Sequence, residues 1–285
     1  MSKNTVLDIQ NTVKSKGRIL DLTNPVVMGI LNATPDSFYN KGKGRDVESL
    51  LHMAEKMIND GATILDIGGT TTKPGAQLIY PDEEMKRVLP AVEAIAKRFP
   101  EVWISIDTYN APVAKSTVEA GASIVNDVSS GRFDGNMLQT VAALKVPYIA
   151  MHMQGKPENM QKNPNYSDVL QEVTGYLHNV CSKAQEAGIT DIIIDPGFGF
   201  GKTVEHNFQL LRGLHTLRIL GKPVLAGLSR KSMVCRTLNV TPEYALNGTT
   251  ALNMIALQQG ASILRVHDVK EAVETIKLFK AVNNA

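Results

Sequence analysis

The chain alternates between short apolar runs and longer segments with the spacing of an amphipathic helix, and this alternation limits the possible folds. Turn residues follow each apolar run, and glycine follows several of the helical segments, as is typical of helix C-termini. The apolar runs cover 26–31, 62–68, 102–107, 122–127, 146–152, 191–195, 223–229 and 262–268. The helical segments cover 46–60, 82–98, 110–120, 134–144, 167–187, 204–219, 230–238 with 242–259, and 269–282.

Eight strand–helix units of this kind predict an α/β protein, a closed (β/α)8 TIM barrel in a single domain. The apolar runs do not alternate with polar residues, which is typical of strands buried on both faces of a parallel sheet. Eight units within about 250 residues match the size of that barrel, and a doubly wound open sheet is the competing architecture. We expect residues 25–285 to form the barrel domain and residues 1–24 a partly irregular N-terminal segment, with a short strand at 18–22 that closes the barrel bottom.

The composition argues against several broad classes of protein. The 30 basic residues nearly balance the 28 acidic residues, so nothing favours a nucleic-acid partner. No apolar run reaches the ~20 residues of a membrane helix, and the first residues lack the apolar core of a secretory signal. Cys181 and Cys235 stand in separate segments without metal-ligand spacing. We therefore expect a cytoplasmic protein that binds small molecules, with no nucleic acid and no membrane.

Polar residues stand at the carboxyl ends of the predicted strands, which meet on one face of a barrel and carry its active site. Those that we single out are Asn32, Asp66, Asp107, Asn126, His152, Asp195, Lys231, Arg265 and His267. Asp and Asn are common helix caps, so capping accounts for any single Asp or Asn in this set. Caps do not account for Lys231, Arg265 and His267. We therefore predict a shared rim, in which His152, like His206, is expected to be structural or exposed rather than catalytic.

One group of rim residues fits a flat heterocycle that is rich in N–H groups. The carboxylates of Asp107 and Asp195 each accept two hydrogen bonds side by side, and the amide of Asn126 both donates and accepts. Lys231 can donate to a ring carbonyl or a ring nitrogen. These four side chains therefore predict a heterocycle site on one side of the barrel mouth.

A second group fits an anion. Arg265 and His267 are two residues apart, so they share one face of a strand end. With the helix N-terminus that follows, they predict an anion site with the forked donor of arginine and a second cationic group. The amide oxygen of Asn32 suits a Mg²⁺ ion shared with a phosphate, because Mg²⁺ takes few protein ligands. This side of the mouth is predicted to bind a polyphosphate.

Motifs spread over nearly the whole chain resemble, in order, those of the dihydropteroate synthases. They are GILNATPDSF (29–38), DIGGTTTKPG (66–75), SIDT (105–108), NDVSSG (126–131), MHMQG (151–155), DPGFGFGK (195–202), GLSRKS (227–232) and RVHDV (265–269). Members of that family are (β/α)8 barrels, usually homodimers, and are targets of sulfonamides. The resemblance implies a Mg²⁺-dependent transferase of folate biosynthesis, which joins 6-hydroxymethyl-7,8-dihydropterin pyrophosphate to p-aminobenzoate and releases pyrophosphate.

The resemblance also implies a role for each matching residue. The pterin would be held by Asp107, Asn126, Met151, Asp195, Lys231 and Arg265. The pyrophosphate would be held by Asn32, Thr72, Lys73, Arg265 and His267, with Asn32 acting through the metal. The p-aminobenzoate pocket would use Phe38, Thr72, Pro74, Phe200, Lys231 and Ser232. The catalytic residues would be Asp107, Lys231, Arg265 and His267.

Two loops depart from the usual family pattern. TTTKPG at 70–75 replaces ESTRPG, so Lys73 brings a point charge where arginine offers a fork. PDSFYNKGKG at 35–44 replaces SFSDGG and is longer and more basic. Three alternatives stay open: a pterin-dependent methyltransferase, a non-catalytic pterin-binding paralogue and a phosphosugar barrel. The presence of Asn32, Lys231, Arg265 and His267 argues against a binding-only paralogue.

Overall fold

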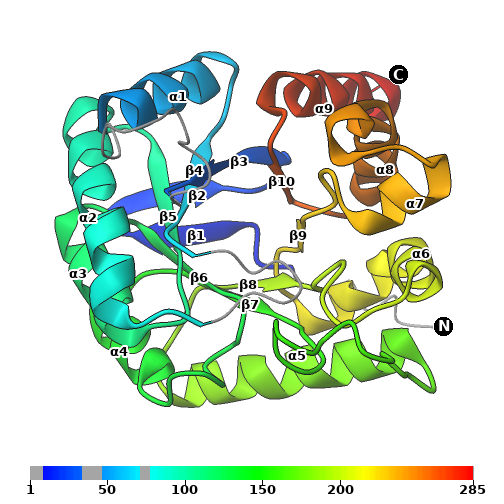
Figure 1. Ribbon diagram of the computed structural model, residues 1–285, viewed down its shortest axis with the longest axis horizontal. Coiled ribbons are helices and arrows are strands. Elements are labelled where there is room, and N and C mark those ends of the chain that lie inside the picture. The colour runs from blue at the N-terminus through cyan, green and yellow to red at the C-terminus, as the bar shows by residue number, and fades with distance from the viewer. Residues whose placement is uncertain (1–8, 34–46, 71–77, 285) are drawn as a thin grey trace, which may run out of the picture.

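A closed parallel barrel forms the centre of the molecule (Figure 1). The computed structural model describes residues 9–33, 47–70 and 78–284. The barrel strands are β3 (Val26–Asn32), β4 (Ile64–Gly68), β5 (Trp103–Asp107), β6 (Ile124–Asp127), β7 (Tyr148–Met151), β8 (Ile192–Asp195), β9 (Leu225–Ala226) and β10 (Ile263–Val266). Their order in the sheet is β8-β7-β6-β5-β4-β3-β10-β9. The backbone N–H of Ile194 donates to the carbonyl of Pro223 at 2.9 Å and closes the ring. The predicted TIM barrel is confirmed, and the open sheet is excluded.

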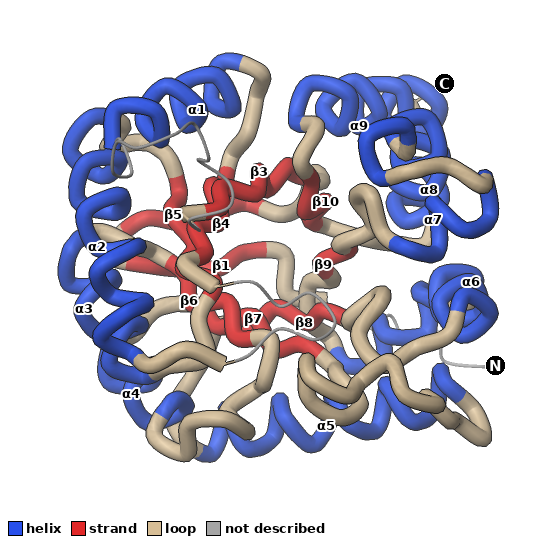
Figure 2. Tube along the Cα trace, viewed as in Figure 1, coloured by secondary structure: helices blue, strands red, loops and turns tan. Residues whose placement is uncertain are grey.

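Helices surround the strands (Figure 2). They are α1 (Val47–Asn59), α2 (Pro81–Arg98), α3 (Ala111–Ala120), α4 (Met137–Leu144), α5 (Val169–Glu186), α6 (Val204–Arg212), α7 (Ser232–Leu238), α8 (Leu246–Gln258) and α9 (Val269–Asn283). In the described ranges, the 3-10 helix η2 (Leu214–Leu220) follows α6, and the 3-10 helix η3 (Pro242–Tyr244) lies between α7 and α8. No helix in the described ranges is long and apolar enough to cross a lipid bilayer.

The structure differs from the sequence prediction around α6 and β9. The helix predicted over 204–219 ends at Arg212, and a 3-10 helix continues after Gly213. The strand predicted over 223–229 pairs with β10 only at Leu225 and Ala226. Pro223 lacks an N–H and Gly227 carries no side chain to pack, so both shorten the ladder. The shortened strand leaves 227–231 as a loop at the barrel mouth.

Local sequence signals begin and end the helices. Pro81 opens α2, acidic residues fill its first turn, and Lys97 and Arg98 occupy its last turn, which complements the helix dipole. Asp168 caps α5, because its carboxylate accepts the backbone N–H groups of Leu170 and Gln171. These local signals set the residues at which α2 and α5 begin.

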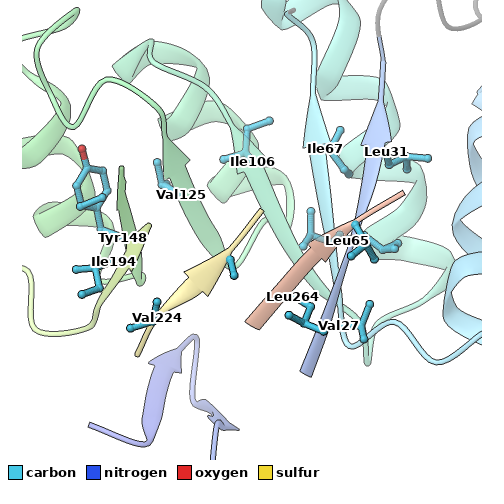
Figure 3. Close-up of a cluster of buried hydrophobic side chains, with 14 of the residues drawn as sticks. Val27, Leu31, Leu65, Ile67, Ile106, Val125, Tyr148, Ile194, Val224 and Leu264 are labelled. Carbon is cyan, nitrogen blue, oxygen red and sulfur yellow. The ribbon is translucent and has the colours of Figure 1, made fainter. Parts of the chain in front are cut away.

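The main apolar core lies between the strands and the helices. Leu31, Ile67, Ile106, Val125 and Leu264 project from successive strands and are buried (Figure 3). Burial of such side chains stabilises the fold by about 1.5–3 kcal/mol each. This layer holds the strands in register and leaves the inner face of the barrel for other residues.

A β-hairpin covers the bottom of the barrel. β1 (Thr12–Ser15) pairs with β2 (Arg18–Asp21) through a tight turn at Lys16 and Gly17, both with positive φ. Val13 and Leu20 pack on the amino ends of the barrel strands, in one cluster with Met28, Ile64, Trp103, Ile124, Ile149, Ile193, Leu225 and Ile263. The short strand predicted at 18–22 is present, and its partner at 12–15 was missed. The Lys-Gly pair at the turn was the available signal.

Candidate active site

The carboxyl ends of adjacent strands bring the predicted rim residues together. Asp107 at the end of β5 lies opposite Asn126 of β6 in the sheet register. Met151 of β7 lies opposite Asp195 of β8 in the same way. Because all of these strands are parallel, their carboxyl ends meet at one mouth, as the sequence predicted.

Arg265 of β10 lies at the centre of this mouth. Its Nε donates to Oδ2 of Asp66 at 2.6 Å, and its Nη2 donates to Oδ2 of Asp107 at 2.7 Å. Nδ2 of Asn126 donates to the same oxygen of Asp66 at 3.1 Å. One guanidinium therefore joins residues from β4, β5 and β10 and indirectly holds β6.

Asp66 belongs to this site, although the sequence prediction named it only as a rim residue and gave it no ligand or catalytic role. It is fully buried on β4, and its second oxygen, Oδ1, has no hydrogen-bond partner among the described residues. The signal in the sequence was a carboxylate inside the apolar run ILDIG, where the strand is buried throughout. A buried carboxylate needs a charged partner. The partner, Arg265, is 199 residues away in the chain, so local patterns could not identify it.

Burial sets the ionisation of the acids in the mouth. It raises the pKa of Asp107, an effect that the neighbouring guanidinium of Arg265 opposes. It also raises the pKa of Asp195, against the opposing charge of Lys231. Burial alone would lower the pKa of Arg265, but Asp66 and Asp107 raise it above its ordinary value. In the described part of the mouth, Arg265 is therefore a permanent cation beside the acids Asp66, Asp107 and Asp195.

Lys231 reaches the mouth from the loop that follows β9. Its Nζ donates to the backbone carbonyl of Phe198 and lies 4.4 Å from the centre of the Phe200 ring. Burial lowers the pKa of Lys231 to about 8, and Asp195 opposes this shift. The ammonium therefore lies between the acids of the mouth and the aromatic side chain of Phe200.

His267 is held by Ser229. Its Nδ1 lies 3.0 Å from Oγ of Ser229, and its backbone N–H donates to the same oxygen at 3.2 Å. Burial, followed by the charges of Arg265 and Arg230, lowers the pKa of His267 to about 4. This shift favours a neutral His267 at pH 7 over the second cationic group that the sequence predicts at this position. A neutral His267 can still donate an N–H to an anion.

Arg230 and Asp268 join the last two loops of the barrel. Nε and Nη2 of Arg230 donate to the two carboxylate oxygens of Asp268 at 3.1 and 2.6 Å. This bidentate pair links the loop that carries Lys231 to the loop that carries His267. It therefore fixes the distance between two candidate ligand-binding groups.

The other predicted residues lie around the same mouth or outside the described residues. Asn32 ends β3 and is half-buried. Met151 is buried in an apolar cluster that Phe200 also contacts. Ser232 is exposed at the first position of α7. The remaining four, Phe38, Thr72, Lys73 and Pro74, lie outside the described residues.

The side chains in the described part of the mouth fit a metal ion that binds together with a phosphate, rather than one that the protein holds alone. The described residues include no group of three His, Cys, Asp or Glu side chains that could hold a metal. Asp66 and Asp107 already pair with Arg265. A Mg²⁺ ion would therefore depend on the amide oxygen of Asn32, on phosphate oxygens and on water, a combination that Mg²⁺ accepts.

Comparison with known proteins places this architecture in a family. A family of pterin-binding enzymes matches residues 28–267. The dihydropteroate synthase of Escherichia coli (strain K12) is 46% identical over 273 residues, which cover 95% of this chain and 96% of that protein. The chain belongs to the dihydropteroate synthase family. The Bacillus subtilis dihydropteroate synthase is 43% identical over 261 residues, which cover 91% of this chain and 89% of that protein.

Solved structures of dihydropteroate synthases share the fold. A Yersinia pestis enzyme in a sulfonamide drug complex is 44% identical, has a TM-score of 0.91 and covers 96% of this chain and 100% of its own. A Xanthomonas albilineans enzyme in complex with 7,8-dihydropteroate is 39% identical, has a TM-score of 0.87 and covers 96% of this chain and 99% of its own. The chain is therefore an enzyme, a transferase of folate biosynthesis.

Proposed function

We propose that the mouth around Arg265 condenses 6-hydroxymethyl-7,8-dihydropterin pyrophosphate with p-aminobenzoate, giving 7,8-dihydropteroate and pyrophosphate. Membership of the dihydropteroate synthase family supports this reaction. The observation that carries the residue roles is the bridge from Arg265 to Asp66 and Asp107. It gathers acids and a cation where a charged ring and a charged leaving group would meet.

The pterin would lie against Asp107, Asn126 and Asp195. These side chains supply acceptors and one amide donor in a buried setting, where hydrogen bonds to a heterocycle are selective. Lys231 and Arg265 would border the ring, and Met151 would pack on its apolar face. The bound 7,8-dihydropteroate of the Xanthomonas albilineans relative supports a pterin in a site of this fold.

The pyrophosphate would lie against Arg265 and His267, with Asn32 as the protein ligand of Mg²⁺. Arg265 supplies a fixed positive charge, and neutral His267 supplies an N–H whose orientation Ser229 sets. The metal, when bound, would neutralise charge on the phosphate oxygens. Thr72 and Lys73, outside the described residues, are proposed to complete this side.

The reaction needs charge stabilisation rather than a protein nucleophile. The bond between the pterin methylene carbon and the phosphate oxygen breaks, and its electron pair leaves with pyrophosphate. The carboxylates of Asp107 and Asp195 would stabilise the resulting cation, which is delocalised into the ring. The amine of p-aminobenzoate then attacks the carbon and loses a proton. The proposed catalytic groups, Asp107, Lys231, Arg265 and His267, would act by electrostatics and position.

The p-aminobenzoate would lie between Phe200 and Lys231, with Ser232 near its carboxylate. Phe38, Thr72 and Pro74, outside the described residues, are proposed to form the other walls. A Xanthomonas albilineans dihydropteroate synthase has been solved with 4-aminobenzoic acid, is 40% identical and has a TM-score of 0.91. This likeness supports the same second substrate here.

A direct assay tests the reaction. Purified protein is mixed with Mg²⁺, the pterin pyrophosphate and p-aminobenzoate, and dihydropteroate and pyrophosphate are both measured. We expect equal amounts of the two products and no dihydropteroate without p-aminobenzoate. Pyrophosphate release without dihydropteroate would indicate a hydrolase instead. Methyl transfer from a methylated pterin would favour the methyltransferase alternative.

We also propose that the enzyme acts as a homodimer in the cytoplasm. Ile255 of α8 and Leu278 and Val282 of α9 are exposed apolar side chains on packed neighbouring helices, which could meet a second copy. Cys181 and Cys235 are free thiols, as is usual in a reducing compartment. Light scattering at micromolar concentration tests the dimer, and a monomer mass would contradict it.

A further inference from the structure

Lys202, the last residue of the DPGFGFGK motif, has no part in the chemistry proposed above, yet it is almost fully buried at 3% exposure. Its Nζ lies 2.8 Å from the carbonyl oxygen of Gly197, 3.2 Å from that of Phe200 and 2.9 Å from Nδ1 of His152. These three partners match the hydrogen-bonding capacity of a lysine. The side chain is therefore directed inward at its own loop.

His152, the residue that follows β7, contacts the same loop. Its ring is buried between Tyr166 and Tyr176, at centroid distances of 6.0 and 4.9 Å. Its backbone N–H donates to the carbonyl of Asp195 at 3.0 Å. Gly197 has a φ of +69° and lies so close that a Cβ there would overlap the carbonyl oxygen of His152. The loop therefore rests directly on His152 through both side chain and backbone.

The Lys202–His152 contact can be satisfied whether Lys202 is charged or neutral. Burial lowers the pKa of Lys202 well below its ordinary value, and burial lowers the pKa of His152 to about 2. An ammonium at Lys202 would donate to all three partners. A neutral amine would donate to the two carbonyls and accept from Nδ1–H of His152. The pair thus avoids the cost of an unpaired buried group in either state.

The loop that this pair secures is the one that holds Lys231. The carbonyl of Phe198 accepts from Nζ of Lys231, and the Phe200 ring lies beneath the same atom. The two carbonyls that contact Lys202, those of Gly197 and Phe200, flank Phe198 in the chain. Movement of the loop would therefore displace both contacts of Lys231 at once.

We propose that Lys202 and His152 form a buried positioning pair, which fixes the loop 195–202 and thereby places Lys231 and Phe200 for p-aminobenzoate. The proposal rests on the role of Lys231 and Phe200 proposed above. Neither member of the pair is among the residues proposed above to contact substrate. A loss of the pair should therefore change the affinity for p-aminobenzoate more than it changes the fraction of folded enzyme.

The test compares Lys202→Met with Lys277→Met in the full-length enzyme. Lys277 is exposed on α9, so its variant controls for loss of one lysine. We expect the KM for p-aminobenzoate to rise about tenfold in Lys202→Met and to stay unchanged in Lys277→Met. A merely structural lysine would lower kcat through lost folded protein and leave KM unchanged. An unaltered KM in folded Lys202→Met would overturn the proposal.

Two variants of His152 test the pair if Lys202→Met does not fold. His152→Asn keeps a polar partner for Lys202, whereas His152→Leu removes it. We expect His152→Asn to retain a KM within about threefold of the native enzyme and His152→Leu to raise it about tenfold. Equal KM values for the two variants would contradict a positioning role.

The same experiments separate this proposal from the proposed function. If Lys231→Met raises KM but Lys202→Met and His152→Leu do not, the positioning pair fails and the function stands. If the native enzyme makes no dihydropteroate, the function fails, and the crystal structure of Lys202→Met, or of His152→Leu where Lys202→Met does not fold, decides on the pair. Loss of the contact between Lys231 and Phe198 there would support the pair, and its retention would refute it.

Discussion

The two ends of the barrel differ sharply although the same strands build both. Along β4, Ile64 packs against the N-terminal hairpin at the bottom, and Asp66, two residues later, binds Arg265. Along β10, Ile263 lies in the bottom cluster and Arg265 lies in the mouth. Residues two apart on a strand face the same side. The interior thus changes from apolar to charged within about 7 Å of strand, since each residue adds about 3.3 Å.

The bottom of the barrel therefore contributes mainly to stability, and the mouth contributes mainly to chemistry. The bottom cluster gains free energy because apolar surface leaves water. Burial of charges at the mouth destabilises the folded protein, and only pairing with opposite charges offsets this cost. Changes at the bottom should therefore alter stability with little effect on catalysis. Changes at the mouth should alter catalysis, and they should also lower stability where they leave a buried charge unpaired.

Asp107→Asn is expected to have the largest effect. It removes a negative charge from the mouth and keeps the shape, so kcat should fall by about 10²–10³, the usual effect of losing one electrostatic contact in a transition state. Binding of pyrophosphate should be retained. Steady-state kinetics and calorimetry measure the two quantities. Asp82→Asn, on the exposed first turn of α2, is the control, and full activity of Asp107→Asn would defeat its proposed role.

Leu20→Ala tests the opposite end. Leu20 is 5% exposed in the bottom cluster, so its truncation should lower the free energy of unfolding by about 2–4 kcal/mol. Urea denaturation measures this change. KM and kcat of the folded variant should stay within about twofold of the native values. A tenfold change in either constant would show that the two ends are not independent.

Glu84 offers a contrast with the paired acids of the mouth, because it is a buried acid whose hydrogen-bond partners among the described residues, Thr108 and Asn110, carry no charge. Its Oε2 accepts from Thr108 at 3.0 Å and from Asn110 at 2.7 Å, and burial raises its pKa to about 7. Between its ordinary pKa of 4.5 and pH 7, the folded protein holds a proton that the unfolded chain has lost. The free energy of unfolding should therefore fall as pH rises through this window, by up to about 3 kcal/mol.

Glu84→Gln removes this proton and its pH dependence. The stability of the variant relative to the native enzyme should improve by about 3 kcal/mol between pH 5 and pH 8, or less where the site relaxes. Urea denaturation at both pH values measures it, and the difference between the proteins cancels the titration of other acids. The same relative stability at both pH values would show that Glu84 is ionised throughout.

His267→Ala should have the smallest effect of the four. Neutral His267 supplies one hydrogen bond rather than a charge, so its loss should raise the KM for the pterin pyrophosphate about tenfold, or ~1.4 kcal/mol. Ser229→Ala removes only the group that orients the ring and should raise KM less. A hundredfold or larger effect of His267→Ala would indicate a cation or a proton donor instead.

Much of the site could be predicted because it depends on short-range order. Asp107, Asn126 and Asp195 each stand at or next to the last residue of a buried strand, and parallel strands bring their carboxyl ends together. The lowered pKa of His267 could not be predicted, because burial and the charges of Arg265 and Arg230 cause it, and the tertiary structure sets both. The burial of Lys202 could not be predicted either, since no local sequence pattern distinguishes a buried lysine from an exposed one.

The sequence by itself determined the barrel and the edge at which its chemistry gathers, because strand and helix periods and turn residues act over a few positions. Only the tertiary structure decided which charges meet. The pairing of Asp66 with Arg265, and of Lys202 with His152, joins residues 199 and 50 positions apart. Such pairs form because a buried polar group must find its partner in space, wherever that partner lies in the chain.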